Sequence, residues 1–87
     1  MLEVKKFYGV WCGPCKMLTP TIESLKTKFS DVKFSDIDVD MDFEAASQYS
    51  VRNIPLVVIE KNGKEVQRFA GVQSELAYAN AINEWKN

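Results

Sequence analysis

The first half of the chain alternates between two patterns of apolar residues. Leu2 to Tyr8 is short and ends in aromatic residues, which predicts a strand. Beyond Cys15, apolar residues recur three or four positions apart, which is the spacing of one face of a helix. These residues are Leu18, Ile22, Leu25 and Phe29. From Val32 to Val39 apolar and polar residues alternate with one change of phase, so a second strand is expected there.

The second half predicts a short helix and a hairpin. Asp42 is suited to cap a helix over Phe43 to Tyr49, because its carboxylate can accept backbone N–H groups at a helix start. Leu56 to Ile59 is a continuous apolar run, as expected for a strand that is covered on both faces. Asn62-Gly63 then favours a two-residue turn, and Glu65 to Ala70 supplies the returning strand.

A last helix completes the pattern. Gly71 interrupts the preceding strand, and Ser74 can cap a helix that carries apolar residues on one side, namely Leu76, Ala79, Ile82 and Trp85. The predicted order is β-α-β-α-β-β-α, an α/β fold with a four-stranded mixed sheet flanked by three helices. Alternating strands and helices favour parallel neighbours, and the final hairpin adds an antiparallel pair. Because 87 residues are too few for two ordinary domains, residues 1–87 are expected to form one.

Composition and charge narrow the classes of function. Hydrophobic residues make up 46% of the chain and charged residues 26%, which is the mix of an ordinary soluble globule. The formal net charge is −1, so binding of nucleic acid by a general basic field is not expected. The chain has no histidine, which excludes imidazole acid–base catalysis and metal sites that histidine ligates.

The amino terminus and the two cysteines indicate where in the cell the protein is expected and what the cysteine pair is suited to do. Residues 1–6 lack the apolar core of a secretory signal, and nowhere do roughly 18 apolar residues run together as a membrane span requires. The chain is therefore expected in the cytoplasm, without a membrane contact. Its only cysteines, Cys12 and Cys15, are separated by two residues, and a bridge across so short a loop adds only about 2 kcal/mol of stability. The pair is therefore better suited to take part in a reaction than to stabilise the fold.

Both cysteines are expected at the start of the first helix. The segment Trp11-Cys12-Gly13-Pro14-Cys15 follows the first strand closely, and the helical pattern begins at once. Pro14 fits the first turn, where backbone N–H groups have no partner within the helix. Those free N–H groups and the positive end of the helix dipole stabilise a thiolate.

The spacing assigns different roles to the two sulfur atoms. Cys15 lies three residues before Leu18 and seven before Ile22, so it shares the buried face of the helix, whereas Cys12 lies outside that face. We expect Cys12 to be the exposed attacking thiolate and Cys15 the shielded resolving thiol. Cys12 would attack a substrate disulfide, and Cys15 would then displace the product and leave the Cys12–Cys15 bridge.

A metal site is an alternative for this pair. A structural zinc site needs four ligands, and this chain offers two cysteines, so only a dimer that shares two pairs could hold zinc or an iron–sulfur cluster. We therefore expect no bound metal.

Three separated motifs resemble the thioredoxin family. Residues 11–17, Trp-Cys-Gly-Pro-Cys-Lys-Met, with Pro20 further along the helix, are similar to the active site of that family. Residues 51–55, Val-Arg-Asn-Ile-Pro, resemble its loop with a cis-proline, and Lys61-Asn62-Gly63 with Gly71 resembles its last hairpin. The resemblance covers nearly the whole chain. It implies a minimal thioredoxin-like fold and a dithiol–disulfide oxidoreductase.

The resemblance also implies roles for individual residues. Pro55 would be the cis-proline beside the dithiol, and Ile54 would offer backbone groups to a substrate strand. A shallow substrate-binding surface would include Trp11, Gly13, Pro14, Ala70, Gly71 and Val72. The implied partners are disulfide-containing client proteins and a thioredoxin reductase or similar reductant. No cofactor beyond the Cys12–Cys15 disulfide is expected, and the protein is expected to be a monomer.

The sequence departs from the family pattern at three places. The chain begins at what resembles the family's second strand, so Val32 to Val39 is expected at an edge of the sheet. Leu56 stands where thioredoxins generally carry threonine. Lys6 and Asp36 occupy positions where the family has an aspartate and commonly a lysine, so the two charges are exchanged.

The exchanged charges lead to a hypothesis about catalysis. We expect Lys6 and Asp36 to form a partly buried ion pair beneath the active site and to contribute to catalysis. Lys6 cannot accept a proton, but its charge favours a thiolate at Cys15, which stabilises the reduced form. The redox potential is then expected to shift toward the oxidising side. The alternative is a surface contact that is worth little.

Several functions fit these residues. The first is a reductant of protein disulfides, which is favoured by Gly13 and Pro14 between the cysteines. The alternatives are a glutaredoxin-like enzyme, an oxidase or isomerase of disulfides, and a non-catalytic binding subunit that uses the fold without turnover.

Overall fold

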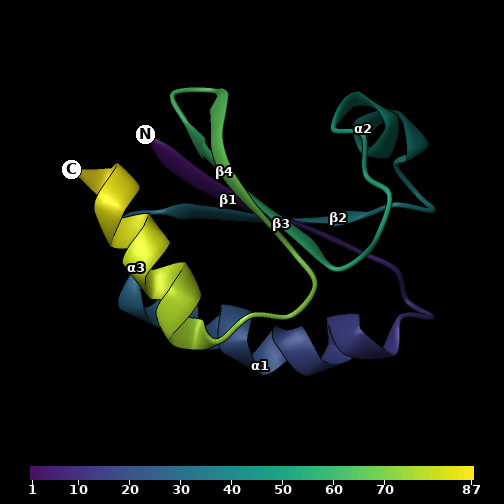
Figure 1. Cartoon of the computed structure of the whole chain (residues 1–87), viewed down its shortest axis with the longest axis horizontal. Helices are drawn as coiled ribbons and strands as arrows, with labels where there is room; N and C mark the ends of the chain where they lie inside the picture. The colour runs from purple at the N-terminus through teal and green to yellow at the C-terminus, as the bar shows by residue number, and fades with distance from the viewer.

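The computed structural model describes residues 1–87 and contains four strands and three helices (Figure 1). In chain order these are β1 (Leu2–Tyr8), α1 (Gly13–Lys28), β2 (Lys33–Asp38), α2 (Phe43–Gln48), β3 (Leu56–Lys61), β4 (Lys64–Ala70) and α3 (Glu75–Lys86). The predicted order β-α-β-α-β-β-α is therefore confirmed. None of the three helices is long and apolar enough to span a membrane.

The sheet has the strand order β2-β1-β3-β4, with β2 at one edge, as expected. β1 and β2 are parallel and place Lys6 opposite Asp36. β3 is antiparallel to both β1 and β4. The turn between β3 and β4 places Asn62 at a φ of 54° and Gly63 at 82°. These are the positive values that asparagine and glycine adopt most readily, so the sequence suits this turn.

The pairing of β1 with β3 differs from the parallel arrangement that the alternation of strands and helices predicted. α2 has six residues and is therefore roughly 9 Å long, whereas a six-residue strand is roughly 20 Å long. Tyr8 pairs with Asp38 at the end of β2, and its neighbour Phe7 pairs with Leu56 at the start of β3. β3 consequently starts near the end at which β2 stops and runs in the opposite direction.

Helices cover both faces of the sheet, with α1 and α3 on one face and α2 on the other (Figure 1). The larger core lies between the sheet and the helices α1 and α3, and Leu18 and Ile22 of α1 belong to it. The smaller core lies on the α2 side and contains Phe7, Leu56 and Val58. β3 contributes to both cores, which explains why its apolar run is continuous.

α3 packs against the core through three of the four predicted residues, Ala79, Ile82 and Trp85, and Leu76 is the exception. Tyr78, Ala81 and Ile82 are buried, whereas Leu76 is 68% exposed. A repeat of three residues drifts around a helix that has about 3.6 residues per turn, so Leu76 and Ile82 lie on different faces. The predicted position of Leu76 on the buried side is therefore wrong.

Candidate active site

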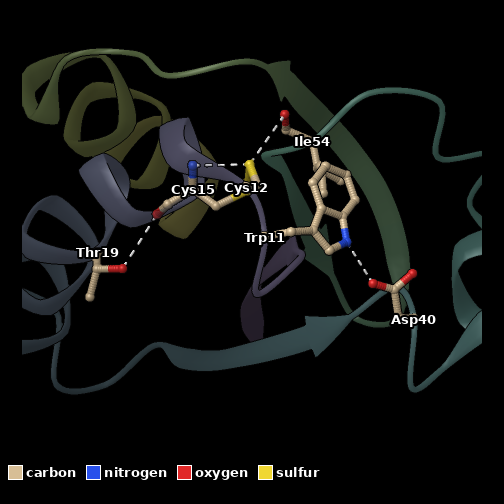
Figure 2. The surroundings of a disulfide bond; sticks show 6 residues. All are labelled: Trp11, Cys12, Cys15, Thr19, Asp40 and Ile54. Carbon is tan, nitrogen blue, oxygen red and sulfur yellow. Dashed lines mark hydrogen bonds between the residues drawn. A yellow bond between two sulfur atoms is a disulfide. The ribbon is translucent and has the colours of Figure 1, made fainter.

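Cys12 and Cys15 lie at the amino-terminal end of α1 and form a disulfide (Figure 2). Cys12 is the N-cap of the helix, and its Sγ accepts a hydrogen bond of 3.2 Å from the backbone N–H of Cys15. Pro14 lies in the first turn, as predicted, and no acidic side chain is present there. Free N–H groups and the positive end of the helix dipole therefore favour a thiolate at Cys12 once the disulfide opens.

The two cysteines do not differ in exposure while the disulfide is formed. Cys12 is 4% exposed and Cys15 is 3% exposed in the disulfide. The exposure of a Cys12 thiolate, which exists only in the reduced form, stays a prediction. The Sγ atom of Cys12 is bonded to Cys15 and lies 3.9 Å from the backbone oxygen of Ile54. These neighbours occupy surface that a free thiol would present. Cys15 shares the buried face of α1 with Leu18 and Ile22, as the spacing predicted.

The loop before β3 borders the disulfide. The peptide bond between Ile54 and Pro55 is cis, and Pro55 is buried while Ile54 is half-buried. The backbone N–H of Gly71 donates a hydrogen bond of 2.9 Å to the carbonyl oxygen of Pro55, which ties the segment after β4 to this loop. The fold therefore brings the loop before β3 to the end of α1 and links the segment after β4 to that loop.

Exposed side chains lie around the disulfide. Trp11 is 66% exposed, and its Nε1–H donates a hydrogen bond of 2.7 Å to Oδ2 of Asp40, which follows β2 (Figure 2). Of the other residues expected in the substrate-binding surface, Gly71 is half-buried and the rest are exposed, namely Gly13, Pro14, Ala70 and Val72. Asp40 was not expected at the site, because an acidic residue after a strand is ordinarily a solvated surface charge.

Lys6 and Asp36 lie next to each other on β1 and β2. Lys6 is 8% exposed, and its Nζ lies 3.7 Å from Oδ1 of Asp36, whose side chain is 42% exposed. The second carboxylate oxygen of Asp36 lies 3.8 Å from Nζ of Lys26 on α1. Lys6, Asp36 and Cys15 line one cavity of about 360 Å³. The pair thus has one buried partner and one partner near the surface.

The family model for thioredoxin matches residues 2–84. The chain belongs to the thioredoxin family. It is 41% identical over 78 residues to a thioredoxin of Chlamydia caviae, which covers 90% of this chain and 76% of that protein. It is 46% identical over 74 residues to a thioredoxin of Gallus gallus, which covers 85% of this chain and 70% of that protein. The X-ray structure of Fasciola hepatica thioredoxin superposes with a TM-score of 0.90 at 40% identity, over 97% of this chain and 80% of that one.

Membership of the thioredoxin family, together with the Cys12–Cys15 pair, establishes the chemistry. The chain is a dithiol–disulfide oxidoreductase that acts on disulfide substrates. Its couple interconverts one disulfide and two thiols, with the transfer of two electrons. The predicted thioredoxin-like fold is also confirmed, since solved thioredoxins share the four-stranded sheet and its helices.

One buried polar cluster of this thioredoxin was not indicated by the sequence. Glu60 is 5% exposed, accepts a hydrogen bond from the hydroxyl of Tyr49 and lies 3.2 Å from Nζ of Lys5. Lys5 also donates a hydrogen bond of 2.8 Å to the oxygen of that hydroxyl. The hydrogen bond with Tyr49 raises the pKa of Lys5 above its ordinary value, and burial raises the pKa of Tyr49.

The position of Glu60 explains what this cluster does. Glu60 is in phase with Leu56 and Val58 along β3, so its side chain points to the α2 face, away from the face that α1 covers. Tyr49 is the C-cap of α2, a helix with no buried residue of its own. The cluster therefore holds α2 on the thioredoxin sheet and takes no part at the dithiol.

Gly9 of this thioredoxin lies where a side chain would disturb Trp11. A Cβ atom at this position would lie 2.9 Å from Cε2 of Trp11 and 3.1 Å from Cδ1 of Ile54. Because the indole is largely exposed, we expect Gly9→Ala to displace it from Asp40 while the protein stays folded. A net hydrogen bond is worth about 1 kcal/mol, so we expect the KM for a protein disulfide to rise a few-fold. Steady-state kinetics and tryptophan fluorescence measure this.

Asp40→Ala is the matched comparison for Gly9→Ala, because it removes the same hydrogen bond from the other side. Both variants are expected to show the same direction of change in KM and in the fluorescence of Trp11. Kinetics equal to those of the unaltered protein in both variants would contradict a role for the Trp11–Asp40 contact.

Proposed function

We propose that this thioredoxin reduces disulfides in client proteins, with Cys12 as the attacking thiolate and Cys15 as the resolving thiol. The observation that carries the proposal is the hydrogen bond from the N–H of Cys15 to Sγ of Cys12 at the positive end of α1. The same N–H group favours negative charge on Cys12 after the disulfide opens. Cys15 lies further into the helix and on its buried face, where a client disulfide has poorer access.

The proposed reaction consists of two thiol–disulfide exchanges. The thiolate of Cys12 attacks one client sulfur, a mixed disulfide forms, and the other client sulfur leaves as a thiolate that takes a proton from water. Cys15 then loses its proton to solvent and attacks Sγ of Cys12. The Cys12–Cys15 bond forms, and the second client sulfur leaves as a thiolate. Two electrons pass from the dithiol to the client, and the protein ends as the disulfide.

The surroundings of Cys12 support the binding of an extended client segment. The carbonyl oxygen of Ile54 lies 3.9 Å from Sγ of Cys12, so a client strand that pairs with this backbone brings its own disulfide to the sulfur. Trp11 and Val72 add exposed apolar side chains, and Pro55 connects this loop to the segment after β4. Contact with backbone and apolar surface suits a range of client sequences.

The proposed cycle needs a reductant and no further cofactor. A thioredoxin reductase or a similar dithiol donor returns the Cys12–Cys15 disulfide to two thiols. The protein acts as a monomer in the cytoplasm, where the surroundings keep thiols reduced. Gly13 and Pro14 carry no charge between the cysteines, which favours the reducing direction of the exchange.

Reduction of insulin disulfides tests the proposal. We expect catalysed reduction with dithiothreitol as the electron source, and again with a thioredoxin reductase and NADPH. Cys12→Ser is expected to abolish it. Turnover with glutathione alone would instead indicate a glutaredoxin-like enzyme. Absence of turnover with every electron source would overturn the proposal and leave a non-catalytic binding role.

A further inference from the structure

Lys6 is a buried cation that the exchange reactions leave unused. Its side chain is 10% exposed, and its Nζ lies 3.7 Å from Oδ1 of Asp36 and 5.4 Å from the centroid of the Tyr8 ring. A lysine is rarely buried unless its charge has partners. The carboxylate and the aromatic face supply those partners and hold the ammonium group in place.

Lys6 and Cys15 lie on the same cavity. The cavity of about 360 Å³ is lined by both residues. The charged or titratable groups around it are Lys6 and Tyr8 of β1, Cys15 and Lys16 of α1, and Asp36 of β2. Charges that line the same cavity as a thiol change the balance between thiol and thiolate.

Asp36 does not cancel the charge of Lys6 completely. One of its carboxylate oxygens faces Lys6, and the other lies 3.8 Å from Nζ of Lys26. Asp36 is therefore shared between two cations, and its side chain is 42% exposed, so water also screens it. Lys6, by contrast, is buried. The cavity that Cys15 lines therefore has two cationic side chains, Lys6 and Lys16, and one carboxylate, Asp36.

We infer that Lys6 and Asp36 set the redox potential of the Cys12–Cys15 couple in opposite directions, Lys6 by stabilising the thiolate of Cys15 and Asp36 by offsetting the charge of Lys6. A thiolate exists only in the reduced form, so a cation beside it stabilises that form and makes the couple more oxidising. Both are positioning residues that act through Cys15. The inference rests on the proposed function. It adds the groups that tune the redox potential of the Cys12–Cys15 couple.

The redox potential of single variants provides the first test. Wild type, Lys6→Met and Asp36→Asn are equilibrated with defined ratios of oxidised and reduced dithiothreitol at pH 8, where ordinary cysteine thiols begin to ionise. Lys6→Met is expected to favour the disulfide about threefold, a shift of about 14 mV toward the reducing side. Asp36→Asn is expected to shift the potential the other way. Lys33→Met, an exposed lysine at the far end of β2, is the control and leaves the potential unchanged.

Alkylation of Cys15 provides the second test and separates charge from structure. In a Cys12→Ser background, iodoacetamide is expected to react with Cys15 about threefold more slowly at pH 8 after Lys6→Met and at the original rate after Lys6→Arg, which keeps the charge. If Lys6→Met does not fold, Asp36→Asn decides the matter, because its expected shift is opposite in sign. An unchanged potential in Asp36→Asn, a shift of the same sign as in Lys6→Met, or an equal shift in Lys33→Met overturns the inference. These results leave the proposed function intact. The proposed function fails only if the wild-type protein itself does not reduce insulin.

Discussion

Replacing Cys15 with serine converts the protein from a catalyst of disulfide reduction into a trap for its clients. Cys12 still attacks a client disulfide in this variant, but no second thiol is present to displace the client. The mixed disulfide therefore accumulates, and turnover with insulin is expected to fall to the uncatalysed rate. Intact-mass spectrometry under non-reducing conditions measures one client chain bound per protein, and dithiothreitol releases it.

Cys12→Ser is the matched control, because it makes the same change at the other sulfur of the pair. Cys15 lies on the buried face of α1 beside Leu18 and Ile22, so we expect this variant to form little adduct. An adduct in Cys12→Ser and none in Cys15→Ser would reverse the two roles. That result would overturn the proposed order of the exchanges.

Lys5→Met is expected to lower the free energy of unfolding by about 3 kcal/mol, because it leaves Glu60 buried without its cation. Removal of one partner of a buried ion pair costs about 3–5 kcal/mol, and the lower end applies since the Lys5 side chain is 21% exposed and Tyr49 still donates a hydrogen bond to Glu60. A small domain has about 5–15 kcal/mol of stability in total, so the loss is large. Urea unfolding followed by tryptophan fluorescence measures it.

Two further variants identify the cause of this loss. Lys5→Met combined with Glu60→Leu is expected to recover most of the stability, because no buried charge then remains without a partner. Glu65→Gln breaks an ion pair with Arg68 between half-exposed side chains and is expected to cost less than about 1 kcal/mol. A cost for Lys5→Met no greater than that for Glu65→Gln would show that the buried cluster does not hold the fold together.

The order of the elements could be predicted from the sequence because each signal is local. Asn62 and Gly63 suit the turn that they form, and the apolar spacing of α1 marks its buried face within a single segment. The direction of β3 could not be predicted in the same way. It depends on the path of the whole segment between Asp38 and Leu56, and the pattern predicts the short helix in that segment but not its path. Leu76 was misplaced because apolar spacing alone does not show which face of α3 meets the sheet.

For the site too, features formed by residues near in sequence could be predicted from local patterns, and contacts between distant residues could not. Cys12 and Cys15 are neighbours in sequence, so the pair and its position at a helix start could be predicted. The partners of Trp11 and Lys5 could not, because Asp40 is 29 residues from the former and Tyr49 is 44 residues from the latter. Lys6 and Asp36 are also far apart in sequence, and the resemblance to a family, not a local pattern, indicated their contact. Such contacts exist only after the strands and loops have assembled.

α2 contributes no buried residue, whereas α1 contributes several to the larger core. The two sides of the sheet therefore resist local opening to different degrees, because the free energy of opening grows with the apolar surface that becomes exposed. Opening of α2 is therefore expected to cost less free energy than opening of α1 and of the sulfur atoms at its end. We expect the backbone amides of α2 to exchange their hydrogens with solvent soonest, and the oxidoreductase centre to keep its shape throughout these excursions.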